Sequence, residues 1–302
     1  MRRLVAPLVG IAWLVACGAP ADVPAGDRPQ RIISLVPATT EMLFAIGAGP
    51  DVVGVGSFDR HPPEIESIPR VGALVDPDVE RIFALRPDLV VVYGSQDDLI
   101  SRLSRAGIPR YDYEHAGLAD ITDTIRSLGA RVGRAGEAGR LASDIEREIE
   151  DIRSAVEDRP RPRTALIFGR DAGSLRGLFA SGGVGFLHDM LVAAGGDDAF
   201  ADVRRQSVQI SVETLLARAP EVIMEVHPDE GWTPEVIARD LALWQTVPGL
   251  PAVRDGRVHI LADYRLLVPG PRVADAIRLM AATLHPDAFR TPAAEPAATT
   301  AR

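Results

Sequence analysis

The stretch Gly136–Asp158, with the sequence GEAGRLASDIEREIEDIRSAVED, decides the fold of this chain. Its apolar residues recur at alternating steps of four and three, which places them on one stripe of an α-helix. Charged residues fill the other faces, and Arg147 stands one turn from Asp151, where the two can form an ion pair. The pattern predicts one helix of roughly 22 residues, about 33 Å long at about 1.5 Å per residue. The stripe consists of Ala138, Ala142, Ile145, Ile149, Ile152 and Val156.

The sequences on either side of this helix resemble each other. Val79–Val91 and Val212–Met224 both read as a short helix, a proline followed by an acid, and a buried strand. A second pair of similar stretches precedes them: Glu41–Gly49 and Asp189–Gly196 each read as a helix that ends at glycine. Two pairs in the same order predict two similar lobes joined by the helix. The alternatives are a chance match of short apolar phrases and an ordinary surface helix.

Strands and helices alternate in both halves, which predicts an α/β fold of two Rossmann-like lobes with mostly parallel sheets. We place the N-terminal lobe at residues 31–132, the connecting helix at 133–160 and the C-terminal lobe at 161–289. A threonine of Pro37–Thr40 is expected to cap the first helix. Ligands of open α/β sheets bind beyond the carboxyl ends of the strands, so we expect a ligand cleft between the lobes.

Composition and motifs exclude several classes of function. The chain has 302 residues and a net charge of −9, which argues against nucleic acid as a partner. The sequence lacks a phosphate-binding Walker loop, a Gly-x-Ser-x-Gly elbow and a His-Glu-x-x-His motif, and its six histidines form no metal-binding cluster by spacing. We therefore expect a protein that is not an enzyme and has neither an intrinsic cofactor nor a metal site, although an enzyme on a two-lobed scaffold stays an alternative.

The N-terminus reads as an export signal. Arg2 and Arg3 precede the short apolar run Leu4–Val15, and Leu14-Val15-Ala16-Cys17 resembles a bacterial lipobox. Residues 1–17 are therefore expected to be a lipoprotein signal peptide with lipidation at Cys17, the only cysteine; a leftover thiol is the alternative. Residues 18–30 read as a flexible tether and residues 290–302 as a disordered tail.

Three phrases together carry a family resemblance: Arg31–Glu41, Glu80–Val90 and Pro269–Arg272. In this order they resemble the substrate-binding proteins of ABC importers for cobalamin and ferric siderophores, which have a single connecting helix. The resemblance covers about Arg31–Pro286 and is more specific for the superfamily than for the ligand. It implies a lipid-anchored, monomeric protein on the periplasmic or extracytoplasmic face of a bacterial membrane. Such a protein delivers its ligand to a permease dimer with ATPase subunits.

The resemblance also implies the ligand and its contacts. Cobalamin or a related corrinoid is the first expectation, and a ferric siderophore or haem is the alternative, so the ligand itself would carry the metal. Cobalamin binders place tryptophans six residues before each repeated glutamate, where this chain has Leu74 and Ser207. His61 could meet the ligand's metal or be only a residue of a proline-flanked turn. The implied contacts are Pro37, Ala38, Phe58, His61, Tyr93, Gly94, Tyr264 and Arg265.

Four charged residues have expected roles in docking or in ligand binding. Glu80 and Glu213 match the paired surface glutamates, one per lobe, that dock on arginines of the permease, because two separated charges fix orientation as well as contact. The alternative is that each only stabilises the first turn of its helix through the helix dipole. Arg265 and Arg272 could bind carboxylates or phosphate of an anionic ligand.

Overall fold

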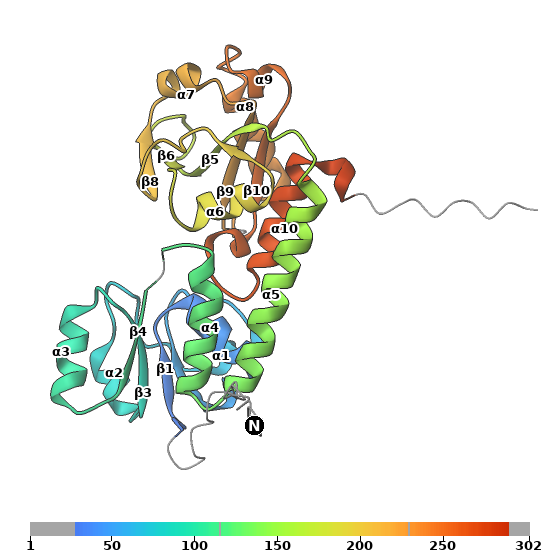
Figure 1. The fold of residues 1–302 in the computed structure, drawn as a ribbon. Helices are drawn as coiled ribbons and strands as arrows, with labels where there is room; N and C mark the ends of the chain where they lie inside the picture. Colours follow the sequence, from blue (N-terminus) through green and yellow to red (C-terminus); the bar gives the residue numbers. More distant parts are fainter. Residues whose placement is uncertain (1–27, 115, 229, 290–302) are drawn as a thin grey trace, which may run out of the picture.

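The computed structural model describes residues 28–114, 116–228 and 230–289 as two lobes, one above the other, with α5 (Ala135–Val156) running along both (Figure 1). Cys17, the signal peptide, most of the tether and the tail lie outside the described residues. Within the described part of the chain, none of the helices combines the length and apolar character needed to cross a membrane.

The N-terminal lobe is built on a four-stranded sheet in which every pairing is parallel, in the order β2-β1-β3-β4. Its central strand β3 is the apolar run Leu-Val-Val-Val-Tyr, which is buried except for its last residue. The strands are β1 (Ile32–Ser34), β2 (Val52–Val55), β3 (Leu89–Tyr93) and β4 (Arg110–Tyr113). The helices are α1 (Pro37–Ala45), α2 (Val79–Ala84), α3 (Asp97–Arg105) and α4 (Ala119–Arg131), with 3₁₀ turns η1 (Gly49–Asp51) and η2 (Pro63–Ser67).

The C-terminal lobe is built on a mixed sheet in the order β10-β9-β5-β6-β8, with β7 paired to β5. β6 pairs antiparallel with both β5 and β8. The short loop between β5 and β6 can only return the chain in the opposite direction. The strands are β5 (Arg163–Gly169), β6 (Leu178–Ser181), β7 (Asp197–Asp198), β8 (Ser207–Ile210), β9 (Val222–His227) and β10 (Val258–Ala262). The helices are α6 (Phe186–Ala193), α7 (Val212–Arg218), α8 (Pro234–Trp244), α9 (Pro251–Arg254) and α10 (Val273–Leu284), with η3 (Tyr264–Leu267) and η4 (Pro286–Ala288).

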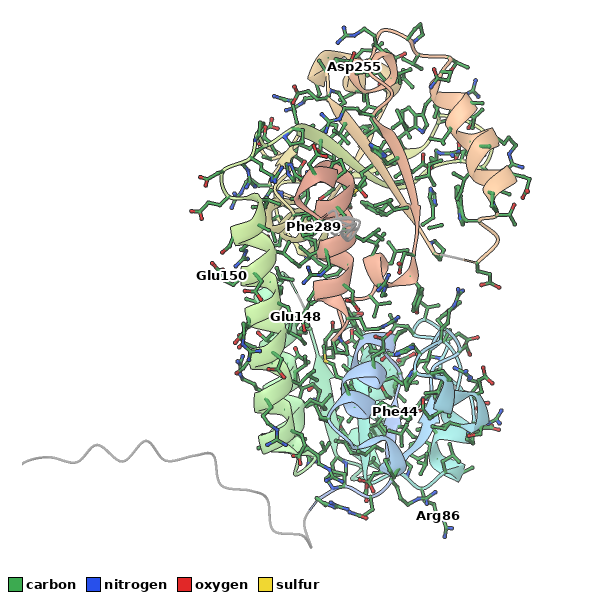
Figure 2. All side chains as sticks on the ribbon, turned by 90° about the vertical axis from the view of Figure 1, so that its right-hand side faces the viewer. Phe44, Arg86, Glu148, Glu150, Asp255 and Phe289 are labelled. Atoms are coloured by element: carbon green, nitrogen blue, oxygen red, sulfur yellow. The ribbon has the colours of Figure 1, made fainter. Side chains whose placement is uncertain are left out.

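The predicted fold class is confirmed, and the connecting helix has the predicted length and buried stripe. All six stripe residues are buried, and α5 packs on α4 in one lobe and on α10 and α6 in the other. Figure 2 shows α10 beside α5 in a second view, so the lobes share a two-helix spine. The prediction that Arg147 forms an ion pair with Asp151 is wrong, because Arg147 binds Asp144 at 2.7 Å. An acid that lies N-terminal to its base is the favoured order on a helix.

The internal repeat is visible in matching hydrogen bonds. Asp88 and Glu221, which hold the same place in the repeat, each accept a backbone N–H at the start of a central strand, from Arg31 and Arg163 at 2.9 and 2.8 Å. The residue before the repeated proline has φ of 47° in both lobes, at Arg86 and Ala219. The two lobes are therefore copies of one design down to their backbone turns.

The start of α1 differs from the expected threonine cap. Val36 occupies the N-cap position without a side-chain hydrogen bond, and Pro37 is the first helical residue. Proline suits this position because its φ is already helical and it has no N–H that needs a partner. Thr39 lies inside the helix, where its hydroxyl donates to the carbonyl of Val36 at 3.0 Å.

Truncating the α5 stripe should destabilise the whole chain. Ile152→Ala is expected to lower the free energy of unfolding by about 2–5 kcal/mol, because it opens a cavity in a fully buried contact. The exposed Glu148→Ala on the same helix should change it by no more than about 0.5 kcal/mol. Urea unfolding of both variants measures the difference, and equal midpoints would show that the stripe carries no packing energy.

Candidate ligand-binding cleft

The loop after β2 meets η3 across the gap between the lobes. The Tyr264 hydroxyl donates to the carbonyl of Phe58 at 3.0 Å, although the two residues are 206 positions apart. Arg60 from the same loop lies 5.1 Å from the centre of the Tyr264 ring and reaches Glu230 of the C-terminal lobe at 2.6 Å. These contacts use the backbone of Phe58 and leave its residue 61% exposed. The predicted meeting of loops from opposite lobes is thus present, with an aromatic ring free at the junction.

A buried ion pair joins the lobes close to the spine. Arg272, which precedes α10, binds Glu41 of α1 through two hydrogen bonds of 2.6 and 2.8 Å. The Glu41 side chain is 2% exposed, so the bidentate geometry is what offsets the cost of burying its charge. Arg272 is therefore occupied by the protein itself and does not offer the free cation for an anionic ligand that the sequence suggested.

A second acid, which belongs to the C-terminal lobe, makes the corresponding contact with the N-terminal lobe. Asp189 of α6 accepts the backbone N–H of Leu118 at 2.9 Å, just before α4. Glu41 and Asp189 are the first residues of the two repeated helical stretches. The equivalent helix of each lobe therefore contacts the opposite lobe. The two contacts fix the angle between the lobes on either side of the cleft.

The N-terminal wall of the cleft combines tyrosine with close backbone packing. Tyr93 ends β3 and meets Tyr113 edge-on, with ring centres 5.9 Å apart. A side chain at Gly94 would come within 2.7 Å of the Glu114 carboxylate, so the flexible Glu114 side chain would have to shift to admit it. Pro37 is half-buried, whereas Ala38 is only 2% exposed. Pro37 and Tyr93 therefore offer more contact surface to a ligand than Ala38 does.

The C-terminal wall has aromatic residues that the sequence analysis missed. A cavity of about 360 Å³ opens beside the segment that follows η3, at the small end of the roughly 300–1,000 Å³ typical of ligand pockets. Phe168 stands at the carboxyl end of β5, one residue before the expected strand end, and packs at 6.5 Å against Phe179. Ser207, which stands where cobalamin binders have tryptophan, lines the same cavity. The lining residues are Phe168, Phe186, Leu187, Gln206, Ser207, Leu267 and Pro269.

Two arginines at strand ends are engaged by carboxylates. Arg265 pairs with Asp263 at 2.6 Å and with Asp275 at 3.4 Å, and the hydrogen bond that it donates to Asp263 is the first cause that raises the pKa of Arg265. Arg170 is buried between Glu225 and Asp240, at 2.7 Å from each. A ligand that used Arg265 would have to compete with two carboxylates of the protein.

His61 is the one predicted site residue with metal-binding chemistry. It is half-buried in the loop after β2, and burial is the main cause that lowers the pKa of its imidazole. A neutral imidazole has a lone pair for a metal. In the described part of the chain, no group of three His, Cys, Asp or Glu side chains is placed to hold a metal ion.

Asp59, between Phe58 and Arg60, is a buried acid that the sequence analysis missed. It is 3% exposed, and its Oδ1 atom has no hydrogen-bond partner. Burial raises the pKa of Asp59 to about 7, and the hydrogen bond from Thr40 acts in the opposite direction. This carboxyl group is next to the exposed Phe58 in the chain, and its pKa of about 7 lets its charge change near neutral pH.

Glu80 and Glu213 are exposed at the starts of α2 and α7. Both helices lie on the side of the molecule away from α5, with α7 at the top of the upper lobe and α2 at mid-height of the lower lobe (Figure 1). The N-caps Asp78 and Ser211 also correspond, each accepting a backbone N–H three residues on. The two carboxylates are thus presented by equivalent turns, one per lobe.

Comparison with known proteins assigns the class. The family model for periplasmic binding proteins matches residues 32–264, and the chain belongs to this family. It is therefore a binding protein and not an enzyme, as the sequence analysis expected.

The relatives narrow the class further. The Vitamin B12-binding protein of Salmonella typhimurium is 34% identical over 226 residues, covering 74% of this chain and 78% of the relative. The uncharacterized ABC transporter substrate-binding lipoprotein YvrC of Bacillus subtilis is 27% identical over 89% of this chain and 84% of its own length. The periplasmic heme-binding protein RhuT from Roseiflexus, solved in apo form, is 27% identical, covers 86% of this chain and 99% of its own, and superposes with a TM-score of 0.72.

The buried Asp59 should make stability depend on pH. Because its folded pKa of about 7 lies above an unfolded value of about 3.9, the folded state holds the proton more tightly. Stability should therefore fall as pH rises from about 4 to 7, by up to about 1.4 kcal/mol per unit. Asp59→Asn should remove this part of the slope, and the exposed Asp76→Asn should keep it. Urea unfolding between pH 4 and 8 is the measurement, and equal slopes in wild type and Asp59→Asn would contradict the assignment.

Proposed function

We propose that the chain is the substrate-binding subunit of an ABC importer and captures cobalamin or a related corrinoid between its lobes. The observation that carries this is the exposed Phe58 ring, held at the junction of the lobes by the Tyr264 hydrogen bond. The B12-binding relative supports the corrinoid, and the ABC transporter relative supports the importer.

The chemistry of the walls suits a large, mostly apolar ligand with a few polar anchors. Phe58 and Tyr93 contribute rings from one lobe, and Phe168 and Phe186 contribute rings from the other. Aromatic faces stack on planar macrocycles, while Arg265 and His61 supply polar contacts at the rim. Pro37, Ala38 and Gly94 complete the proposed binding surface through their backbone and small side chains.

Haem is the second candidate, and a specific observation favours it: Leu74 and Ser207 replace the tryptophans expected of a cobalamin binder. The similarity to a heme-binding protein supports the same alternative, and a ferric siderophore belongs with it. Burial raises the pKa of Tyr264 to about 12, and its hydroxyl already donates to Phe58, so this phenol stays protonated. His61 is therefore the better candidate to meet the metal of either ligand.

The setting of the protein follows from its proposed role. Lipidation at Cys17 would anchor a monomeric protein to the extracytoplasmic face of a bacterial membrane, and the lipoprotein relative supports this anchor. Glu80 and Glu213 would dock on arginines of a permease dimer, which works with ATPase subunits. Their placement on equivalent turns of the two lobes supports a partner with two similar docking points.

Removing the exposed ring should weaken ligand binding. Phe58→Ala is expected to raise Kd at least about tenfold, since burying an aromatic side chain contributes about 1.5–3 kcal/mol. Val192→Ala, which trims another exposed apolar residue, on α6 and 40% exposed, should leave Kd unchanged. Calorimetry with cobalamin, cobinamide, haem and a ferric hydroxamate identifies the ligand at the same time. Binding of the corrinoid with no loss in Phe58→Ala would place the site elsewhere.

Reversing the docking charges should stop transport without affecting capture. The double variant Glu80→Lys/Glu213→Lys is expected to abolish ligand-stimulated transport in proteoliposomes, because like charges then face the permease arginines. The control Glu148→Lys/Glu150→Lys makes the same charge change on α5 (Figure 2) and should transport normally. Normal transport by the first variant would mean that the two glutamates only stabilise their helices.

A further inference from the structure

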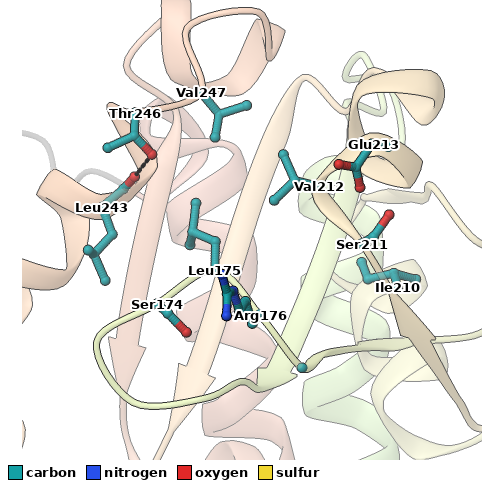
Figure 3. A pocket seen from close by; sticks show the side chains of 11 residues that line it. Ser174, Leu175, Arg176, Ile210, Ser211, Val212, Glu213, Leu243, Thr246 and Val247 are labelled. Atoms are coloured by element: carbon teal, nitrogen blue, oxygen red, sulfur yellow. Dashed lines mark hydrogen bonds between the residues drawn. The ribbon is translucent and has the colours of Figure 1, made fainter.

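The C-terminal lobe has a cavity beside Glu213 that the cleft does not use. Its volume is about 500 Å³, and it lies between the loop after β5, the start of α7 and the end of α8. Figure 3 shows the side chains of Leu175, Val212 and Val247 pointing toward one another inside it. Ile210 and Leu243 complete the apolar part of the walls. The lining is therefore mixed, and these apolar side chains form a cluster within it beside polar groups.

Charged groups stand in the lining of the cavity. Glu213 is exposed on the α7 side and Arg176 is exposed on the loop after β5. Neither side chain forms an ion pair within the described residues, unlike the neighbouring Arg218, which binds Asp202 at 2.6 Å. The Ser211 hydroxyl donates a hydrogen bond to the Glu213 carboxylate. An apolar cluster with this exposed carboxylate beside it is complementary to a basic residue that is followed by an apolar one.

We propose that this cavity receives an apolar side chain of the permease, next to the arginine or lysine that binds Glu213. The inference rests on the proposed docking function and adds that the C-terminal lobe is held by shape as well as charge. Buried apolar contacts slow dissociation, whereas exposed charges mainly steer association. The cavity therefore supplies the part of docking that salt does not screen.

The N-terminal lobe presents a different surface at the equivalent place. Val75 is 90% exposed on the turn of Ala73–Asp76, shortly before Glu80. One glutamate is thus preceded by a projecting valine and the other lies beside a hollow. The two docking points carry the same charge but opposite shapes, so the two halves of the permease surface make unequal contacts with this protein.

Filling the cavity tests the proposal. Thr246→Trp on the α8 side should occupy the hollow and raise Kd for the importer at least about tenfold, measured by interferometry on importer in nanodiscs. Gln245→Trp, the neighbouring exposed residue outside the lining, is the matched control and should change Kd less than about twofold. Ser174→Trp fills the cavity from the opposite wall and protects the test against a folding defect in one variant. Ligand affinity of all three variants should equal that of wild type.

The outcomes separate this inference from the function on which it rests. If Glu213→Lys weakens importer binding but Thr246→Trp and Ser174→Trp bind as wild type, the cavity is not part of the interface and docking stands on charge alone. If, instead, the double variant Glu80→Lys/Glu213→Lys binds the importer as tightly as wild type, the docking function fails and the inference fails with it. Weakened binding in both tryptophan variants, at 50 mM and at 500 mM salt alike, supports an apolar contact.

Discussion

Two acidic side chains, each reaching out of its own lobe, set the geometry on which the cleft depends. Glu41 holds Arg272 and Asp189 holds the backbone of Leu118, so each lobe is tied to the other by the same position of the internal repeat. A buried carboxylate without its partner would be costly, and this cost keeps the lobes together. Because α5 braces the same two lobes, the loops at the strand ends have little freedom to separate.

This arrangement explains why the cleft can be lined largely by rings and small residues. Since α5, α10 and the two acidic contacts carry the mechanical role, the loop of Phe58 needs only the Tyr264 hydrogen bond and the contacts of Arg60 to face the opposite lobe. Its side chain stays exposed for a ligand. The same loop contains Asp59, a carboxyl group that is buried without a full set of hydrogen-bond partners.

The surfaces around Glu80 and Glu213 differ between the two lobes. The repeat places Glu80 and Glu213 on equivalent turns, but the surroundings have diverged into a projecting valine and a cavity with an apolar cluster. The proposed docking groups sit on α2 and α7, on the side of the molecule away from α5, whereas the proposed ligand contacts sit on the loops that meet between the lobes (Figure 1). Changes on one surface can leave the other intact.

The sequence by itself determined the spine, the two-lobed plan and the loops that meet, because these follow from periodicity, from repeated phrases and from the rule for strand ends. Through a family resemblance it also predicted ligand contacts at Phe58 and Tyr264, and the structure brings these two residues together. Only the tertiary structure decided that Arg272 belongs to Glu41, 231 positions away, and that Arg265 is held by acids of its own lobe. The aromatic wall around Phe168 likewise depends on how the two lobes and their loops pack. Polar pairing between distant residues is set by the three-dimensional placement of whole elements, and no local pattern of residues encodes it.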